Sequence, residues 1–485
     1  MSQYEAVIGL EVHAELQTRS KMFCGCAVVD STSAPPNTYV CPVCLGMPGV
    51  LPVLNHRAVE LGLRVGLALN CEIPPFNRFA RKSYFYPDLP KGYQISQYDY
   101  PLAVRGWLEI DLPDGSSKRV RIRRVHLEED TGKLTHVDDH SLIDFNRAGV
   151  PLLEIVSEAD IRSAEEAEAY ARKLRAILRY LGVNSGDMSK GVLRVEPNIS
   201  VRPRGEEAFR TRTEIKNLNS IRSLARATAY EIERQVALYE SGGQVQQATM
   251  GWDEARQVTV VQRVKESADD YRYFPEPDLP PLEISRAWVK EVRAALPELP
   301  SAKRDRLMQQ MGLSRYDASV LVAEKAVADY FEATVQAGGD PKQVANYILG
   351  DLFRRMKDEG RPREQIGDIP LKPVMLAELL ALVAEGTINH GVAKKLLGTL
   401  YAEGGDPRRL VEERGLAQVR DEEALGQAVA QVLDEHPEEV ARFLAGEEKL
   451  AQFLMGMVMR ALRGKADAQA VRRLLQAQLE ARRKA

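Results

Sequence analysis

Three ionisable side chains alternate with apolar ones near the start of the chain. Residues 7–16 have the sequence Val-Ile-Gly-Leu-Glu-Val-His-Ala-Glu-Leu, so Glu11, His13 and Glu15 occupy every second position. Successive side chains of an extended strand point to opposite faces, which predicts that these three share one face while the apolar residues share the other. A carboxylate beside an imidazole is costly to bury unless a divalent cation or a metal-bound phosphate pairs with it. The alternative is an ordinary edge strand with one face in water.

More carboxylates interrupt strand-like segments within the first 200 residues. They are Glu128 and Glu129 in 123–133, Glu154 in 151–156 and Glu196 in 193–201. Together with Glu11 and His13 they supply hard oxygen ligands and one imidazole. Such a set suits the Mg²⁺ or Mn²⁺ that ATP chemistry requires to neutralise phosphate oxygens. Each glutamate taken alone is better explained as an ion-pair partner, so the metal hypothesis depends on the whole set.

Two lysines are candidates for binding phosphate or a substrate carboxylate. Lys82 lies just before an aromatic run, and Lys216 lies in a Glu-Ile-Lys-Asn-Leu-Asn segment. The alternative for each is an ordinary surface lysine. The sequence has no Gly-x-x-x-x-Gly-Lys-Ser/Thr loop, because Gly132 and Lys133 are followed by Leu134 rather than by a hydroxyl residue. Any ATP site is therefore not of the phosphate-loop class.

Four of the five cysteines form two close pairs, Cys24 with Cys26 and Cys41 with Cys44, separated by a 14-residue loop. In a chain without a secretion signal, this spacing predicts a four-thiolate zinc site. Four protein ligands leave no open coordination position, so the predicted role is structural. The alternatives are free thiols or a disulfide. We expect the fifth cysteine, Cys71, to lie in the core.

Length and composition indicate a soluble protein with several domains. A chain of 485 residues is too long for one core, and 44% hydrophobic and 28% charged residues are typical of globular proteins. No apolar run approaches the about 20 residues that span a bilayer. The first residues lack the basic region of a signal peptide. We therefore expect a cytoplasmic protein without membrane contact.

The charge is unevenly distributed in the last part of the chain. Residues 460–485 contain eight Lys or Arg against two acidic residues, whereas residues 403–448 contain 13 Asp or Glu against five Arg. The basic end fits a polyanionic partner, and the alternative is a solvated helix.

The hydrophobic pattern predicts an α+β protein in which a strand-rich part precedes a helical part. Residues 1 to about 160 are rich in strand and turn signals, including a hairpin signal at Asp114-Gly115 between 107–112 and 119–125. The expected later elements are a helix at 163–181 capped by Ser163, a strand at 193–201, and helices at 221–239, 319–335, 344–356, 374–383 and 453–462. We expect domain boundaries near 295 and near 405.

Several long segments, in this order along the chain, closely resemble the B subunit of the bacterial aspartyl/glutamyl-tRNA amidotransferase. They are residues 7–16, 81–88, 93–97, 126–133, 144–157 and 269–278. The resemblance extends over the whole chain, including the helical part. One departure is Ala159, where the family usually has proline. The four cysteines occur in only part of the family, which fits a stabilising zinc.

The resemblance implies ATP-dependent transamidation of mischarged Glu-tRNA(Gln), Asp-tRNA(Asn) or both. Proteins of this family use ATP and Mg²⁺ to phosphorylate the side-chain carboxylate, and ammonia then displaces the phosphate. A partner with amidase (glutaminase) activity, the A subunit, supplies the ammonia, and the small C subunit completes a heterotrimer. This implied partner explains why the chain lacks glutaminase residues of its own.

The resemblance also implies a fold and roles for individual residues. The implied fold is an antiparallel cradle domain over 1–295 with a zinc-binding insert near 24–44, an all-α helical domain over 296–405, and a helical tRNA-binding tail over 406–485. The residues that match the magnesium-binding core are Glu11, His13, Glu129 and Glu154, and these with Lys82 are the expected catalytic residues. The residues expected to bind substrate or phosphate are Lys82, Tyr84, Glu128, Glu196 and Lys216.

Two other functions compete with this one. A non-catalytic zinc-containing tRNA-binding protein would tolerate loss of Glu129 or Glu154. A relative of the aminoacyl-tRNA synthetases would form an aminoacyl-adenylate and release pyrophosphate. The products made from ATP separate the three hypotheses.

Overall fold

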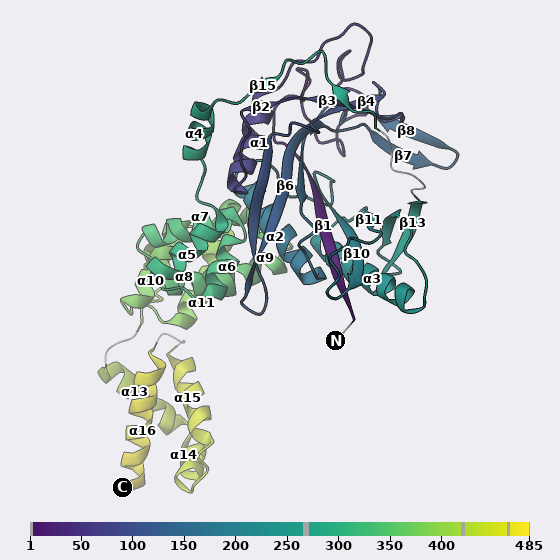
Figure 1. The fold of residues 1–485 in the computed structure, drawn as a ribbon. Coiled ribbons are helices and arrows are strands. Elements are labelled where there is room, and N and C mark those ends of the chain that lie inside the picture. The colour runs from purple at the N-terminus through teal and green to yellow at the C-terminus, as the bar shows by residue number, and fades with distance from the viewer. Residues whose placement is uncertain (1–2, 265–270, 419–421, 463–465, 485) are drawn as a thin grey trace. The chain divides into compact units, whose positions relative to one another are not determined.

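The computed structural model describes residues 3–264, 271–418, 422–462 and 466–484 (Figure 1). The chain divides into two compact units, Met1–Leu299 and Pro300–Ala485. Asp269 and Asp270 of the 269–278 segment lie outside the described residues, as do Arg463 and Lys465 of the basic end.

The first unit is built on a large sheet whose strands follow the spatial order β13-β12-β11-β10-β1-β9-β6-β5 among the described residues. Its strands are β1 (Tyr4–Glu15), β5 (Ala103–Asp111), β6 (Ser117–Glu129), β9 (Pro151–Ser157), β10 (Leu193–Pro203), β11 (Thr213–Lys216), β12 (Ala248–Asp253) and β13 (Val258–Val264). Neighbouring strands pair antiparallel except β11 and β12, which are parallel. A parallel pair needs a crossover connection, and the helix α3 (Ile221–Glu240) lies between these two strands in the chain.

One face of this sheet is apolar and is covered by helices. The helices of this unit are α1 (His56–Ala68), α2 (Ala164–Tyr180), α3 (Ile221–Glu240) and α4 (Arg286–Ala294). Ile8, Leu10, Val12 and Ala14 of β1 are buried in one hydrophobic core with apolar side chains of these helices. Because side chains alternate along β1, Glu11 and His13 point to the opposite, polar face. The apolar side chains of residues 7–16 and the ionisable ones therefore lie on opposite faces of β1, as we expected.

Three smaller sheets accompany the large one among the described residues. Their strands are β14 (Phe274–Pro275), β3 (Ala80–Ser83) and β4 (Tyr93–Ser96) in the first, β15 (Leu282–Glu283) and β2 (Phe76–Asn77) in the second, and β7 (Lys133–Val137) and β8 (His140–Asp144) in the third. The first of these sheets brings the expected site residue Lys82 together with residues that follow it by almost 200 positions.

The second unit is helical throughout its described elements. They are α5 (Pro300–Met311), α6 (Arg315–Val322), α7 (Lys325–Gln336), α8 (Pro341–Asn346), the π-helical η1 (Tyr347–Leu352), α9 (Phe353–Asp358), the 3₁₀-helical η2 (Arg363–Asp368), α10 (Pro373–Ala384), α11 (His390–Glu403), α12 (Pro407–Glu413), α13 (Glu422–Glu435), α14 (Pro437–Leu444), α15 (Leu450–Ala461) and α16 (Ala468–Lys484). Two separate hydrophobic cores form among the described residues, one within 307–411 and one within 425–479. The expected limits of a helical domain at 405 and of a tRNA-binding tail after it stay predictions.

The structure confirms most of the expected elements and corrects others. Ser163 caps α2, because its hydroxyl accepts a hydrogen bond from the Glu166 amide, and β5 and β6 form the expected hairpin. The strand-rich part also contains α1, which we did not expect. The helix expected over 319–335 is wrong, because α6 ends at Val322 and α7 begins at Lys325. No helix among the described residues is long and apolar enough to cross a membrane.

Candidate functional site

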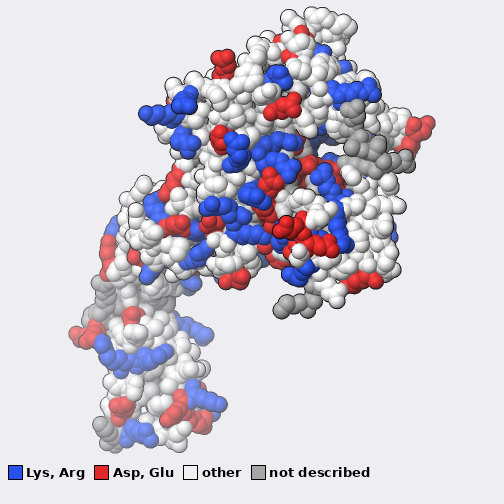
Figure 2. All heavy atoms as spheres, in the orientation of Figure 1, with Lys and Arg blue, Asp and Glu red and all other residues white. Residues whose placement is uncertain are grey.

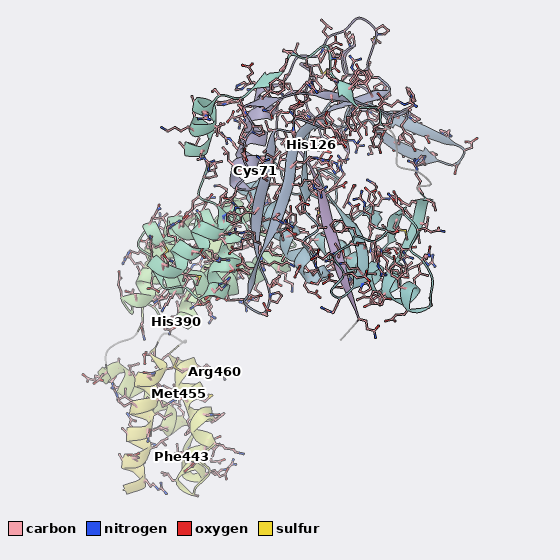
Figure 3. All side chains as sticks on the ribbon, in the orientation of Figure 1. Cys71, His126, His390, Phe443, Met455 and Arg460 are labelled. Carbon is pink, nitrogen blue, oxygen red and sulfur yellow. The ribbon has the colours of Figure 1, made fainter. Side chains whose placement is uncertain are left out.

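The register of three strands brings His13, Glu154 and His126 into one row on the polar face of the sheet. His13 on β1 lies opposite Glu154 on β9, and Glu154 lies opposite His126 on β6. Directly opposed residues of antiparallel strands point to the same face, so the three side chains are neighbours. Residues far apart in the sequence therefore meet at one point of the sheet. Figure 3 labels His126 on β6.

Glu128 joins this row to make a compact group of carboxylates and imidazoles. The His13 Nε2 atom lies 3.4 Å from Glu154 Oε2 and 3.7 Å from Glu128 Oε1. The His126 Nε2 atom lies 3.2 Å from Glu154 Oε2 and 3.7 Å from Glu128 Oε2. Ser96 donates a hydrogen bond of 3.1 Å to Glu128 Oε2. Each carboxylate is thus held between two rings.

Burial and charge together determine the protonation of this group. Burial lowers the pKa of His13, but the hydrogen bond to Glu154 and the charges of Glu154, Glu196 and Glu128 raise that pKa to about 9. For Glu154, burial raises the pKa, but His126 and His13 hold it well below its usual range. His13 is therefore an imidazolium beside the Glu154 carboxylate at neutral pH.

His13, Glu128 and Glu154 fit a divalent cation. One ligand atom from each lies within 4.8 Å of the other two. Two carboxylate oxygens and a ring nitrogen are ligands that Mg²⁺ and Mn²⁺ accept, and such an ion would replace the imidazolium charge that now balances the carboxylates. We call His13, Glu128 and Glu154 together the carboxylate group, with the histidine included. In Figure 2, acidic and basic side chains gather together over the first unit.

Glu11 lies in a second acidic group with Glu196 and Glu214. Glu11 is opposite Glu196 in the β1–β10 pair, and the Asn198 amide donates to Glu11 at 3.2 Å. Burial, followed by the charges of Glu154 and Glu214, raises the pKa of Glu11. Lys216 neutralises this group, because its Nζ atom lies 2.8 Å from Glu196 and 3.0 Å from Glu214. The group forms an ion-pair network beside the carboxylate group.

The structure does not bring Glu129 to either group. Glu129 directly follows Glu128 on β6, so its side chain points to the other face of the sheet. There its carboxylate accepts a hydrogen bond of 2.9 Å from the Ile95 amide and lies 2.6 Å from Lys91 Nζ. Glu129 and Lys91 both line a cavity of ≈ 240 Å³. Glu128 therefore occupies the place that we expected Glu129 to take.

Lys82 lies beside the carboxylate group. Burial lowers the pKa of Lys82, but nearby charges, including those of Glu128 and Glu154, raise it by more than burial lowers it. The amine therefore stays cationic. The Nζ atom lies 4.8 Å from the ring centroid of Tyr271. Tyr84 packs edge-on against the same ring at 6.1 Å, and burial raises the pKa of Tyr84 to about 12. Both residues expected from the 81–88 segment thus border the site.

Sequence reasoning missed the part that His126, Ser96 and Glu214 play. His126 lies two positions before Glu128, so the alternation of β6 could have placed both on one face. Glu214 lies two positions before Lys216 in the same way. Ser96 carries no such signal, because it reaches Glu128 only through the approach of β4 to β6.

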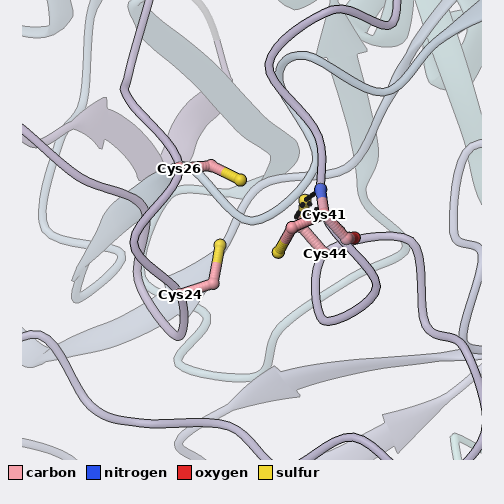
Figure 4. A group of neighbouring side chains, drawn as sticks. All are labelled: Cys24, Cys26, Cys41 and Cys44. Carbon is pink, nitrogen blue, oxygen red and sulfur yellow. Dashed lines mark hydrogen bonds between the residues drawn. The ribbon is translucent and has the colours of Figure 1, made fainter.

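The four expected cysteines converge, with their sulfur atoms turned toward one another (Figure 4). All four Sγ atoms lie within 4.8 Å of one another, and those of Cys41 and Cys44 are 3.9 Å apart. A tetrahedral zinc with Zn–S bonds of about 2.3 Å separates its sulfurs by about 3.8 Å, so the arrangement fits zinc. Cys71 is buried in the hydrophobic core, as expected.

Lys21 adds a buried cation to the cysteine cluster. Its Nζ atom donates to Cys44 Sγ at 3.5 Å and to the Phe145 carbonyl at 3.2 Å. The Cys24 thiol, the Cys41 amide and Lys21 lower the pKa of Cys44 to about 4, against the effect of burial. A thiolate is the form that binds a metal.

Comparison with known families covers nearly the whole chain. The GatB/GatE catalytic domain matches residues 6–290, and the GatB domain matches residues 329–479. A protein of Moorella thermoacetica is 54% identical over 481 residues, which cover 98% of this chain and 100% of that protein. A protein of Thermodesulfovibrio yellowstonii is 51% identical over 474 residues, covering 98% of each chain. Both relatives are named as the B subunit of an aspartyl/glutamyl-tRNA(Asn/Gln) amidotransferase.

Proposed function

Because the chain belongs to the family of the B subunit of the aspartyl/glutamyl-tRNA(Asn/Gln) amidotransferase, we propose that it carries out the ATP-dependent transamidation of mischarged Glu-tRNA(Gln), Asp-tRNA(Asn) or both. The observation that carries this proposal is the carboxylate group, flanked by the cations Lys82 and Lys216. Phosphoryl transfer requires this combination of divalent-cation ligands and fixed positive charge.

The reaction has two steps. The side-chain carboxylate of the tRNA-linked amino acid attacks the γ-phosphorus of ATP, the bond to the β-phosphate oxygen breaks, and ADP leaves. Ammonia then attacks the acyl carbon, the bond from that carbon to the phosphate oxygen breaks, and inorganic phosphate leaves as the amide forms. Phosphorylation is necessary because a free carboxylate would have to expel an oxide ion.

His13, Glu128 and Glu154 would hold the Mg²⁺ or Mn²⁺, and Glu11 lies next to them. The ion supplies neutralisation of the phosphate oxygens. His126 contacts Glu154, and Ser96 donates a hydrogen bond to Glu128. These contacts hold the two carboxylates in place.

The two lysines offer charge to the anionic oxygens of ATP and of the acyl phosphate. Burial lowers the pKa of both amines, but the neighbouring carboxylates raise it by more, so both stay cationic. These carboxylates are Glu128 and Glu154 for Lys82, and Glu196 and Glu214 for Lys216. Each compact ammonium group can approach one phosphate oxygen while it keeps its proton. Tyr84 borders the same space, where its ring packs against Tyr271.

We assign the cysteine cluster to a structural zinc. Four thiolates close the coordination sphere, so the ion takes no part in the reaction. Lys21 offsets part of the negative charge of four thiolates around Zn²⁺. The cluster joins the loop around Cys24 and Cys26 to the loop around Cys41 and Cys44, and thereby fixes the 24–44 insert.

The proposed assembly is a cytoplasmic heterotrimer with an amidase partner, the A subunit, and the small C subunit. The amidase partner frees ammonia from glutamine and delivers it to the acyl phosphate. The first unit of this chain is the cradle domain that holds the reaction site, and residues 406–485 are the tail that binds tRNA. Phosphate contacts of the basic end would make tRNA affinity fall as salt rises.

The test combines product analysis with matched variants. The reconstituted complex is incubated with Glu-tRNA(Gln) or Asp-tRNA(Asn), glutamine and ATP. We expect ADP, phosphate and amidated aminoacyl-tRNA, and we expect Glu154→Gln to abolish all three. Glu109→Gln is the control, because Glu109 is an exposed residue of β5. Pyrophosphate would indicate a synthetase relative, and tRNA binding without ATP turnover would indicate a non-catalytic protein; either result overturns the proposal.

A further inference from the structure

Aromatic side chains line the approach to the carboxylate group, on the side of β3 and β4. Tyr98 stacks on Tyr273 with ring centroids 4.2 Å apart and an angle of 13° between the rings. Tyr273 meets Tyr271 edge-on at 6.2 Å, and Tyr271 meets Tyr84 in the same way at 6.1 Å. Tyr98 remains 47% exposed, although it is stacked on one side. The stack therefore ends in a ring that another flat group can reach.

Cations accompany these rings and connect them to the carboxylate group. The Arg124 guanidinium carbon lies 5.9 Å from the centroid of Tyr98, and its Nη2 atom lies 3.9 Å from Glu154. Lys82, whose pKa Glu128 and Glu154 raise, lies over Tyr271. The guanidinium group of Arg124 thus lies near both the exposed ring of Tyr98 and Glu154 of the reaction site.

A second exposed ring follows two positions later in the same loop. Tyr100 is 42% exposed, and the guanidinium of Arg78 lies 4.7 Å from its ring centroid. Phe76, which is 40% exposed, packs edge-on against Tyr100 at 5.3 Å. A hydrogen bond from the Arg78 amide to the Tyr100 carbonyl joins the two segments. Tyr98 and Tyr100 are therefore successive exposed rings, each with a guanidinium group nearby.

We propose that Tyr98 is a stacking platform for the terminal base of the unpaired 3′ end of the aminoacyl-tRNA, and that Tyr100 receives the base before it. This inference rests on the proposed function and names the part of the chain that positions the tRNA substrate. Unpaired nucleic acid is bound by aromatic rings that stack on its bases and by cations that contact its phosphates. Arg124 and Arg78 supply such cations beside the two rings.

The arrangement favours an RNA end over the adenine of ATP. A mononucleotide has one base and needs one platform, whereas an unpaired strand presents successive bases to successive rings. The reacting carboxylate is covalently joined, through its own amino acid, to the terminal ribose. The terminal base must therefore lie close to the site residues His13, Glu128 and Glu154. Tyr98 lies at such a position, beside Arg124 and Glu154.

The experiment uses the reconstituted complex and a tRNA that carries 2-aminopurine as its 3′-terminal base, because stacking quenches the fluorescence of this base. We expect binding to quench the probe with the unchanged protein and with Tyr98→Phe, which keeps the ring. We expect Tyr98→Ala to lose the quenching. The control is Tyr316→Ala, since Tyr316 is an exposed residue of α6 in the other unit.

Steady-state kinetics give the second readout. Loss of one base–aromatic stack is expected to raise the KM for aminoacyl-tRNA about tenfold in Tyr98→Ala while the KM for ATP stays unchanged. A rise confined to the KM for ATP would show that the ring holds the nucleotide, and no change in either KM would show that it holds neither. Failure of Tyr98→Phe to restore the KM would also overturn the proposal. If the unchanged complex makes no amide, the proposed function fails, but the quenching measurement still tests the platform.

Discussion

His13 and Glu154 lie directly opposite each other on neighbouring strands, with 3.4 Å between the Nε2 and Oε2 atoms. His126 contacts the same carboxylate from the third strand, so Glu154 is the centre of the group. The two imidazole rings compensate the negative charge of Glu154, which explains how a buried carboxylate is stable on this face of the sheet. It also identifies the residues whose replacement should be most informative.

The first prediction distinguishes Glu128 from Glu129. Glu128→Gln should weaken Mn²⁺ binding by more than the about 10–100-fold that is typical for loss of an outer partner, because Glu128 belongs to the carboxylate group. Glu129→Gln should leave Mn²⁺ affinity nearly unchanged, because Glu129 pairs with Lys91 on the other face. Electron paramagnetic resonance of free Mn²⁺ measures both. The reverse order of effects would contradict the assignment.

The second prediction concerns His126 as a positioning residue. His126→Asn removes the contact with Glu154 Oε2 at 3.2 Å but leaves the contacts of His13. We expect Mn²⁺ affinity to fall by about 10–100-fold while the KM for tRNA changes little. Calorimetric titration with Mn²⁺ gives the first value and amidation kinetics the second. Unchanged metal affinity would mean that His126 serves only the packing of the sheet.

The third prediction concerns pH. Burial lowers the pKa of His13, but Glu154 and the nearby carboxylates raise it to about 9, so the ring carries a proton at neutral pH. A metal ligand must be unprotonated, so cation binding should release about one proton, and affinity should rise about tenfold per pH unit between pH 6 and 8. Titrations in two buffers of different ionisation enthalpy count the proton. Affinity that is independent of pH would exclude His13 as a ligand.

The fourth prediction concerns the cysteine cluster. Cys44→Ser should abolish binding of zinc and destabilise the first unit by about 4 kcal/mol, because loss of a structural metal is among the most damaging single changes. Elemental analysis and thermal denaturation measure the two effects. Cys71→Ala is the control, since Cys71 is a core residue outside the cluster and should keep the zinc. Full zinc content in Cys44→Ser would contradict the assignment.

The face of each site strand could be predicted from the sequence, but the register between strands could not. The alternation of Glu11 and His13 with apolar residues correctly placed both on the polar side of β1. Val125 and Leu127 alternate with His126 and Glu128, so the sequence of β6 also separates Glu128 from Glu129 by face. That Glu128 meets Glu154 follows from the pairing of β6 with β9, which depends on contacts across the whole sheet.

The helix α1 shows a second limit of sequence reasoning. It contains Gly62 and Gly66, which lower helix propensity and obscure the pattern. Both glycines are needed because neighbours lie close: a Cβ atom at Gly62 would lie 2.6 Å from Leu102, and one at Gly66 would lie 2.9 Å from Ala103. Tertiary packing therefore selects residues that disfavour the helix locally. The cysteine cluster was easier to predict, since two close pairs of cysteines within 21 residues are by themselves a typical pattern of zinc ligands.

The central claim is that the carboxylate group directs phosphorylation of the tRNA-borne side chain. The most direct measurement uses Glu-tRNA(Gln) whose side-chain carboxylate carries ¹⁸O, with the reconstituted complex, ATP and glutamine. If the carboxylate attacks the γ-phosphorus, one ¹⁸O atom must pass into the inorganic phosphate when ammonia displaces it. We predict labelled phosphate in amounts equal to the amide formed, and neither product with Glu154→Gln. Amide formation with unlabelled phosphate would contradict the account.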